Sequence, residues 1–287
     1  MNLDLKIVLP VVIAFCISVV LCPIVIPFLK KLKFGQFVRD DGPQAHLKKA
    51  GTPTMGGLII LLSLTITTLI YMKKYPDVLP VLFVTLGFGL IGFIDDYIKV
   101  VMKRSMGLHA WQKMLGQIVV TGVFAYYVEK YSDINNELII PFLGKTVQLN
   151  STLYVILLFF IVLGTVNGAN FTDGLDGLAS SVTVLIATFF AVVAVGTDSG
   201  VAPVACAAVG CLLGFLVYNV YPAKVFMGDT GSLALGGFVA STAYMLKMPI
   251  FIVIIAFIYF IISYNTGCFI QAYRQESVQN GTYTSSF

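Results

Sequence analysis

Five of the fourteen acidic residues in this 287-residue chain are aspartates at the borders of long apolar stretches. They are Asp95, Asp96, Asp173, Asp176 and Asp229. A carboxylate close to hydrocarbon is energetically unfavourable, so acidic residues that persist there usually serve a function. These aspartates are therefore the first candidates for chemistry.

Asp95 and Asp96 directly follow the apolar run at residues 87–94, and Lys99 comes three or four positions later. On a continuous helix we expect Lys99 to share a face with both carboxylates. Adjacent carboxylates repel each other unless a cation or a proton lies between them, which suits Mg²⁺ binding or a general base. A solvated helix end with one ion pair is the structural alternative, although one Asp and one Lys would suffice for it.

Residues 167–179 form a polar segment between two apolar stretches, with two Asn, two Asp and three Gly. At the start of a helix, such a segment can present backbone N–H groups and carboxamides to a phosphate or nucleotide, with Asp as a metal ligand. A plain connecting turn would explain the Asn-Gly and Asp-Gly pairs. It would not require both Asp and both Asn.

Residues 226–232 repeat this pattern, because Asp229 lies among glycines and hydroxyl residues. Thr230 or Ser232 could instead be the N-cap of the next helix. Residues 46–57 add two lysines and two threonines on the same predicted membrane face. A basic loop that leads into a capped helix would explain that segment equally well.

Together these residue types fit phosphoryl transfer between a lipid-borne and a water-soluble substrate. Such a reaction needs a divalent cation, cationic groups for the phosphate oxygens, and correct positioning. An ion-coupled transporter is the alternative from a different class of protein. Its acidic residues would be expected near the bilayer midplane between broken helices, whereas these lie at one end of the predicted spans.

Composition indicates that membrane-spanning helices position these residues. The chain is 58% hydrophobic and 11% charged, whereas an ordinary soluble domain has about 25% charged residues. Because a helical span needs about 20 mostly apolar residues, the pattern predicts an all-α, polytopic membrane bundle with nine spans. They cover residues 5–29, 55–72, 78–94, 114–131, 152–166, 178–196, 201–218, 232–246 and 249–266.

The distribution of Lys and Arg predicts the orientation of this bundle. Twelve of these 18 residues fall in connections after odd-numbered spans or in the tail, and six fall on the other side. Since short cytoplasmic loops are enriched in Lys and Arg, we expect the N-terminus outside and all five aspartates at the cytoplasmic face. The richest loops also suit anionic headgroups or a polyanionic substrate, although topology alone explains the same charges.

Residues 1–262 are expected to form one integral membrane domain. The external segment 137–149 alternates apolar runs around Gly144, which predicts a small β-hairpin. The five cysteines lack metal-ligand spacing and are expected to be small core residues.

These motifs resemble those of the phospho-N-acetylmuramoyl-pentapeptide transferases, bacterial enzymes of the polyprenyl-phosphate N-acetylhexosamine-1-phosphate transferase superfamily. The resemblance rests on Asp-Asp-Tyr-Ile-Lys99, Asn-Phe-Thr-Asp-Gly-Leu-Asp-Gly-Leu-Ala179 and Phe-Met-Gly-Asp-Thr-Gly-Ser232, and it covers most of the chain. Residues 46–57 are similar to the segment that distinguishes the muramoyl branch from its GlcNAc-phosphate relatives. A polyprenyl-phosphate GlcNAc-1-phosphate transferase is the alternative enzyme on the same scaffold.

The resemblance implies transfer of phospho-MurNAc-pentapeptide from UDP-MurNAc-pentapeptide to undecaprenyl phosphate, which gives lipid I and UMP in peptidoglycan synthesis. It also implies Mg²⁺ as the cofactor and the bacterial inner membrane as the location. The implied partners are the two substrates, membrane lipid and a second copy of the chain, with no nucleic acid.

Roles for individual residues follow from the same resemblance. Asp229 is expected to be the principal Mg²⁺ ligand, with Asn170 as a second. Asp95 and Asp96 are expected near the lipid phosphate, with Asp96 as a base and Lys99 as their cationic neighbour. The expected substrate-binding residues are Lys49 and Thr54 on the nucleotide-sugar side, Asn170 and Asp173, and Gly174, Leu175, Asp176, Asn219 and Phe226 around the uridine.

The tail departs from the family, which continues with a loop of three consecutive histidines and a tenth span. Residues 264–287 are polar, and the only histidines of this chain are His46 and His109. Under free codon choice, a shift of one base lets residues 275–286 read Lys-Arg-Val-Phe-Lys-Met-Ala-Pro-Ile-His-His-His, which is similar to that loop. We therefore expect residues 263–287 to be an out-of-frame tail, and this form to have reduced activity.

Overall fold

The computed structural model describes residues 3–31, 51–102, 107–132, 134, 136–141 and 143–254, with backbone alone for residues 3–7. Three predictions lie outside these residues. They concern Lys49, the end of the ninth predicted span and the tail at residues 263–287.

Helices make up most of the described chain, with one two-stranded antiparallel sheet. They are α1 (Leu3–Lys31), α3 (Gly57–Tyr71), α4 (Val78–Val100), α5 (Ala110–Tyr131), α6 (Ser151–Thr172), α7 (Leu178–Gly196), α8 (Ala202–Asn219) and α9 (Gly228–Met245). Residues 249–254 are also helical, where the ninth predicted span begins. The sheet pairs β1 (Glu137–Ile140) with β2 (Lys145–Gln148). The predicted all-α bundle with a small hairpin is therefore confirmed, while the number of spans stays a prediction.

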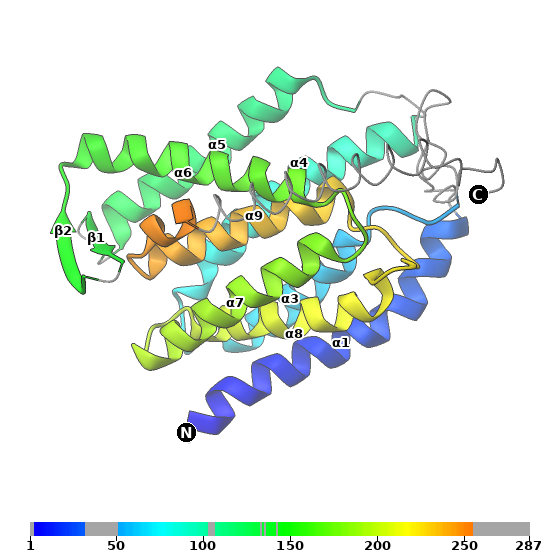
Figure 1. Ribbon diagram of the computed structural model, residues 1–287, viewed down its shortest axis with the longest axis horizontal. Coiled ribbons are helices and arrows are strands. Elements are labelled where there is room, and N and C mark those ends of the chain that lie inside the picture. The colour runs from blue at the N-terminus through cyan, green and yellow to red at the C-terminus, as the bar shows by residue number, and fades with distance from the viewer. Residues whose placement is uncertain are drawn as a thin grey trace, which may run out of the picture.

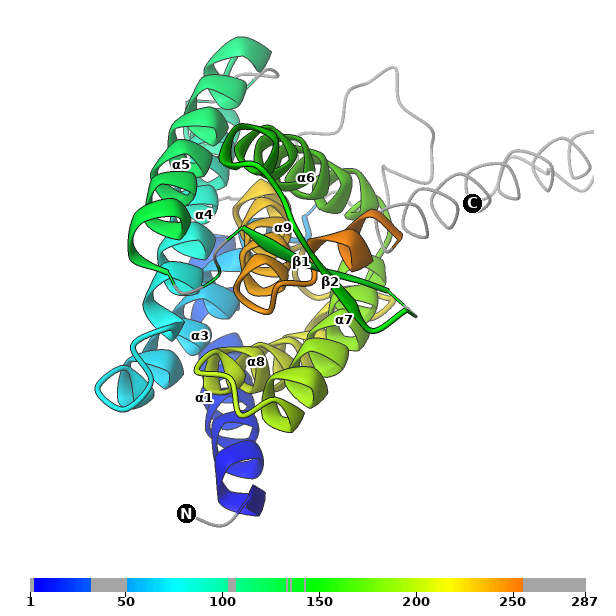
Figure 2. The same ribbon diagram turned by 90° about the vertical axis from the view of Figure 1, so that its left-hand side faces the viewer.

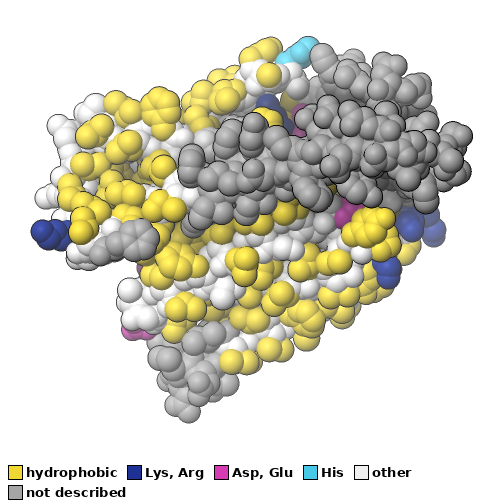
Figure 3. Space-filling view, in the orientation of Figure 1, with side chains coloured by type: hydrophobic (Ala, Val, Ile, Leu, Met, Phe, Trp, Pro, Cys, Tyr) yellow, Lys and Arg dark blue, Asp and Glu magenta, His cyan; other side chains and the backbone are white. Residues whose placement is uncertain are grey.

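The described helices include five that are long and apolar enough to cross a membrane, namely Val8–Lys31 of α1 together with α4, α6, α7 and α8. A helix satisfies its own backbone hydrogen bonds, which is why it can pass through hydrocarbon. In Figure 3, hydrophobic side chains cover much of the described surface between the two ends of the molecule. The chain is therefore a multi-pass membrane protein.

Helix α9 lies in the middle of the bundle, surrounded by α3, α4, α5, α6, α7 and α8 (Figure 2). Its residues from Thr230 to Tyr244 are all buried, and many of them are Gly, Ala, Ser or Thr. Small side chains let helices approach closely in a membrane. Helix α1 packs outside this ring against α8 and α3.

The helices alternate in direction, so functional motifs meet at one end of the bundle. In Figure 1, α4, α6 and α8 end at the right, where α3, α7 and α9 begin. The hairpin lies at the opposite end, where Ile139 N donates to Lys247 O at 2.7 Å and Lys247 Nζ lies 2.6 Å from Glu137 Oε2. All five predicted aspartates lie in or beside the helix ends on the right.

Several helices extend further than their apolar runs. Helix α4 continues to Val100, α6 continues to Thr172, and α9 begins at Gly228. The predicted bounds at residues 94, 166 and 232 were therefore wrong, because backbone hydrogen bonding continues into the polar motifs. As a result, much of the site is built on helices.

Candidate active site

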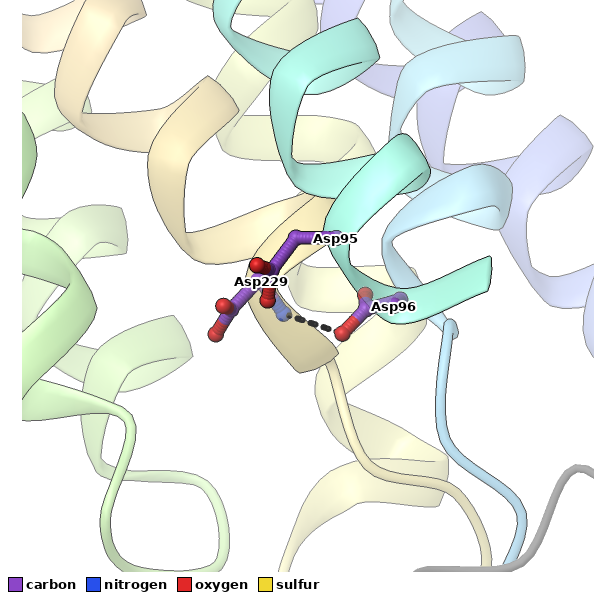
Figure 4. A group of neighbouring side chains, drawn as sticks. All are labelled: Asp95, Asp96 and Asp229. Carbon is purple, nitrogen blue, oxygen red and sulfur yellow. Dashed lines mark hydrogen bonds between the residues drawn. The ribbon is translucent and has the colours of Figure 1, made fainter. Parts of the chain in front are cut away.

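Three aspartates from two helices form the centre of the site (Figure 4). Asp95 and Asp96 lie in the last turns of α4, and Asp229 lies in the first turn of α9. One carboxylate oxygen from each lies within 4.8 Å of those of the other two. Asp95 and Asp96 are buried and Asp229 is half-buried, so the site is an acidic group largely withdrawn from solvent.

Two lysines neutralise part of this negative charge. Lys99 Nζ lies 2.5 Å from Asp95 Oδ2 and 3.0 Å from Asp229 Oδ2. Lys113 Nζ, in the first turn of α5, lies 2.8 Å from the same oxygen of Asp229. Lys113 is not among the predicted site residues, and its place in a connection on the predicted cytoplasmic side is the one signal in the sequence that points to it.

Asp96 faces different partners from Asp95. Its Oδ1 accepts a hydrogen bond from Asp229 N at 3.2 Å, and its Oδ2 accepts from Thr230 N at 2.8 Å and Thr230 Oγ1 at 2.6 Å. The expectation that Lys99 lies beside both carboxylates is therefore met for Asp95, whereas Asp96 bonds to the start of α9.

Asn170 connects α6 to this centre. Its Nδ2 donates to Asp229 Oδ1 at 2.9 Å and to Ser232 Oγ at 2.8 Å. The Ser232 hydroxyl in turn donates to Gly228 O at 3.1 Å. Asn170 thus presents its amide nitrogen to Asp229, and its role as a metal ligand, which would need the amide oxygen, stays a prediction.

The donor set fits a hard divalent cation. Mg²⁺ and Ca²⁺ prefer oxygen ligands, above all carboxylates, and three carboxylates converge here with two ammonium groups beside them. The described cluster contains no cysteine or histidine, so softer transition metals have no preferred ligand in it. The site could therefore hold a metal ion of the Mg²⁺ type.

The predicted uridine residues surround the connection between α8 and α9. Asn219 is buried, accepts from Ser180 Oγ at 2.8 Å and donates to Val225 O at 3.0 Å. Asp176 Oδ2 accepts from Ala223 N at 3.1 Å. These two side chains therefore brace the connection at residues 220–227.

Two further predicted uridine residues, Gly174 and Leu175, lie in the turn between α6 and α7, next to Asp173, which was predicted only to bind substrate. Asp173 is the C-cap of α6, while Gly174 and Leu175 are exposed in the turn. These positions offer an open backbone surface beside the braced connection. Their contact with a nucleotide stays a prediction.

A short ladder of backbone hydrogen bonds joins the segment at residues 53–57 to residues 226–227, directly before Asp229. Phe226 N donates to Pro53 O at 2.8 Å, Gly56 N donates to Phe226 O at 2.8 Å, and Gly57 N donates to Met227 O at 2.9 Å. Thr54 is buried in this ladder. The segment that the sequence assigned to the sugar side and the segment that carries Asp229 are therefore one structural unit.

A helical membrane bundle with carboxylates and lysines clustered at one end suits phosphate chemistry at a membrane face. Residues 78–247 match a family model described as glycosyl transferase family 4. Residues 49–61 match signature 1 of the phospho-N-acetylmuramoyl-pentapeptide-transferases. This second match covers the segment that forms the backbone ladder.

Similar proteins with this name occur in several bacteria. The relative from Caldicellulosiruptor bescii is 47% identical over 260 residues, which cover 90% of this chain and 80% of the relative. The relative from Clostridium botulinum strain Alaska E43 is 51% identical, with 85% and 75% covered, and that from Bacillus subtilis is 47% identical, with 90% and 81% covered. The chain belongs to the phospho-N-acetylmuramoyl-pentapeptide-transferase family, whose members are transferases of peptidoglycan precursor synthesis.

Proposed function

We propose that the protein transfers phospho-MurNAc-pentapeptide from UDP-MurNAc-pentapeptide to undecaprenyl phosphate, forming lipid I and releasing UMP. One observation carries the proposal. The carboxylate and lysine cluster around Asp229 is joined by backbone hydrogen bonds to the segment that matches the family's signature. A group suited to phosphate chemistry therefore adjoins the segment that identifies the muramoyl branch.

Asp229 and Asp95 are the proposed ligands of Mg²⁺, with Asn170 as a further ligand. When bound, the cation would neutralise negative charge on the diphosphate and help to orient it. Lys99 and Lys113 hold ammonium groups beside the same carboxylates. They would bind phosphate oxygens of the two substrates and offset the repulsion between them.

In the proposed reaction, an oxygen of undecaprenyl phosphate attacks the phosphorus that carries the sugar. A new phosphorus–oxygen bond forms, and the bond from that phosphorus to the oxygen of UMP breaks. The oxygen of UMP keeps the electron pair. A phosphate monoester dianion is already a nucleophile, so direct attack needs no strong base.

The nucleotide would bind beside the connection between α8 and α9. The braces from Asp176 and Asn219 support a fixed shape for this connection. The Phe226 ring would stack on the uracil, and Lys49, Thr54 and Asp173 would contact the nucleotide sugar and diphosphate, as the family resemblance implies. We also propose that the reaction occurs at the cytoplasmic face of the bacterial inner membrane, in a homodimer with the N-termini outside.

Parallel donor assays test the proposal. Purified protein in detergent with undecaprenyl phosphate receives radiolabelled UDP-MurNAc-pentapeptide or radiolabelled UDP-GlcNAc, and label in the lipid phase is measured. We expect transfer from the muramoyl donor alone, loss on chelation and recovery on addition of Mg²⁺. Transfer from UDP-GlcNAc alone would assign the GlcNAc-1-phosphate reaction to this scaffold instead.

A further inference from the structure

The first turn of α9 lacks a cap from its own sequence. Met227 is the N-cap residue and offers no side-chain acceptor. Helix starts leave N–H groups without partners inside the helix, and a buried start needs acceptors from elsewhere. The two nearby hydroxyls do not fill this role, because Thr230 donates to Asp96 and Ser232 donates to Gly228 O.

Asp96 supplies the missing acceptors from another helix. Its two oxygens accept from Asp229 N, Thr230 N and the Thr230 hydroxyl. Asp96 and Thr230 are 4% and 0% exposed, so water does not replace these bonds easily. A negative charge at a helix N-terminus is also favourable because of the helix dipole.

The space around this cap admits little change. Gly228 has a φ of +74°, which favours glycine. A Cβ there would lie 2.6 Å from Asp96 Oδ2 and 2.9 Å from Thr54 Oγ1. The carboxylate, the start of α9 and the segment at residues 53–57 are therefore fitted closely together.

We propose that Asp96 of α4 takes the place of a local capping side chain at the start of α9, and that Asp96 and Thr230 act as positioning residues for the carboxylate of Asp229. The inference rests on the proposed function only in taking Asp229 as the metal ligand. One of the three bonds holds the backbone N–H of Thr230, a second holds the Thr230 hydroxyl, and the third holds the backbone N–H of Asp229 itself. Asp96 thus acts through Asp229, and it need not act as a base.

The hydroxyl of Thr230 gives a direct test on the full-length protein. Thr230→Val keeps the shape but loses the hydroxyl, and Thr230→Ser keeps the hydroxyl. Binding of Mn²⁺ is measured by the electron paramagnetic resonance signal of the free ion, and binding of UDP is measured by calorimetry. We expect Thr230→Val to weaken Mn²⁺ binding about tenfold, because a buried hydrogen bond to the Asp96 carboxylate is lost.

Two readouts separate positioning from general damage. Thr230→Ser should bind Mn²⁺ as the original protein does, and all variants should keep their UDP affinity. Equal Mn²⁺ binding by Thr230→Val and the original protein would overturn the inference. Parallel loss of UDP and Mn²⁺ binding in Thr230→Val would also overturn it, because the cap would then support the whole fold.

A double-mutant cycle tests the role of Asp96. If Asp96 acts through Thr230, the losses from Asp96→Asn and Thr230→Val overlap, and the double variant binds Mn²⁺ better than the sum of the losses predicts. Additive losses would assign Asp96 a separate role at the metal. Asp229→Asn tests the proposed function itself. If Asp229→Asn still binds Mn²⁺, Asp229 is not a metal ligand. If Asp229→Asn loses Mn²⁺ binding while Thr230→Val binds it normally, only the positioning role is wrong.

Discussion

Asp95 and Asp96 are adjacent in the sequence, yet their carboxylates bond to different partners. Successive residues of an α-helix point about 100° apart, since a turn contains 3.6 residues. Asp95 therefore faces Lys99 one turn later, while Asp96 faces the start of α9. The two aspartates look like one acidic motif in the sequence, but Asp95 pairs with a lysine of the site and Asp96 caps a helix.

Asp229 is the residue on which the proposed chemistry depends most. Its carboxylate forms ion pairs with Lys99 and Lys113 and accepts a hydrogen bond from Asn170. We expect Asp229→Asn to abolish Mg²⁺-dependent transfer, because a neutral amide keeps the shape of the side chain but loses its charge. The measurement is the transfer rate as a function of Mg²⁺ concentration, with UDP binding as the check on folding.

A matched control for this change lies at the other end of α4. Asp77 is the N-cap residue of α4, and its side chain makes no capping bond. Asp77→Asn removes the same charge far from the site and should leave the rate unchanged. Near-normal turnover of Asp229→Asn at limiting Mg²⁺ would show that another residue holds the metal.

At the scale of elements, α9 is held at both ends. Its first turn bonds to Asp96 of α4 and Asn170 of α6, and the residue before it accepts from Gly57 N. Beyond its other end, Lys247 bonds to the hairpin through backbone and side chain. The contacts at both ends therefore hold α9, and with it Asp229, in a fixed position.

Gly57 allows α3 to meet the first turn of α9 directly. A Cβ at this position would overlap the backbone of Gly231, and backbone atoms cannot rotate away. We expect Gly57→Ala to push α3 and α9 apart and displace Asp229. Displacement of a reacting group by about 1 Å can lower a rate on the order of 100-fold, so steady-state kinetics should show a large fall in kcat.

Gly164 provides the comparison for this substitution. It lies in α6, where no atom of the described residues beyond the adjacent backbone of the same helix comes within 4 Å of an added Cβ. Gly164→Ala should therefore keep its activity and stability, since alanine is also the better helix former. If Gly57→Ala were equally active, close approach of α3 and α9 would not be needed to position Asp229.

The sequence predicted the elements of this bundle well because long apolar runs are a strong signal for membrane helices. It also brought Asp95, Asp173 and Asp229 to one end, since alternating spans fix which ends lie together. Helix bounds were missed because apolar runs stop before backbone hydrogen bonding does. The cap by Asp96 and the contact of Lys113 depend on packing between helices distant in the sequence, which no local pattern contains.

At the scale of the whole molecule, the tail at residues 263–287 lies outside the part of the chain that the structure describes. We propose that residues 263–287 are translated out of frame, which would replace the histidine loop with unrelated polar residues. The metal cluster and the uridine segment lie before residue 263 and would be kept. Restoring the frame should raise kcat by orders of magnitude with a modest change in UDP affinity, as transfer assays and calorimetry would show. Equal rates for both forms would make the histidine loop dispensable.

The two ends of the bundle must face different compartments if the proposed donor is to reach the site. Lys224 lies at the end that holds the aspartates, and Lys145 lies in β2 at the other end, and both are exposed. In intact protoplasts, a membrane-impermeant maleimide should label Lys145→Cys, whereas Lys224→Cys should react only after permeabilisation. The original protein is the control, because its described cysteines lie within helices that can span the membrane.

The expected labelling follows from charge on both the protein and its substrate. Lys and Arg are enriched on the cytoplasmic side, and a nucleotide-linked donor carries charges that keep it from crossing hydrocarbon. The lipid-borne acceptor, in contrast, can present its phosphate at that face while its chain stays in the membrane. Labelling of Lys224→Cys in intact protoplasts would place the aspartate cluster outside, where it could not meet a cytoplasmic nucleotide, and would overturn the proposed orientation.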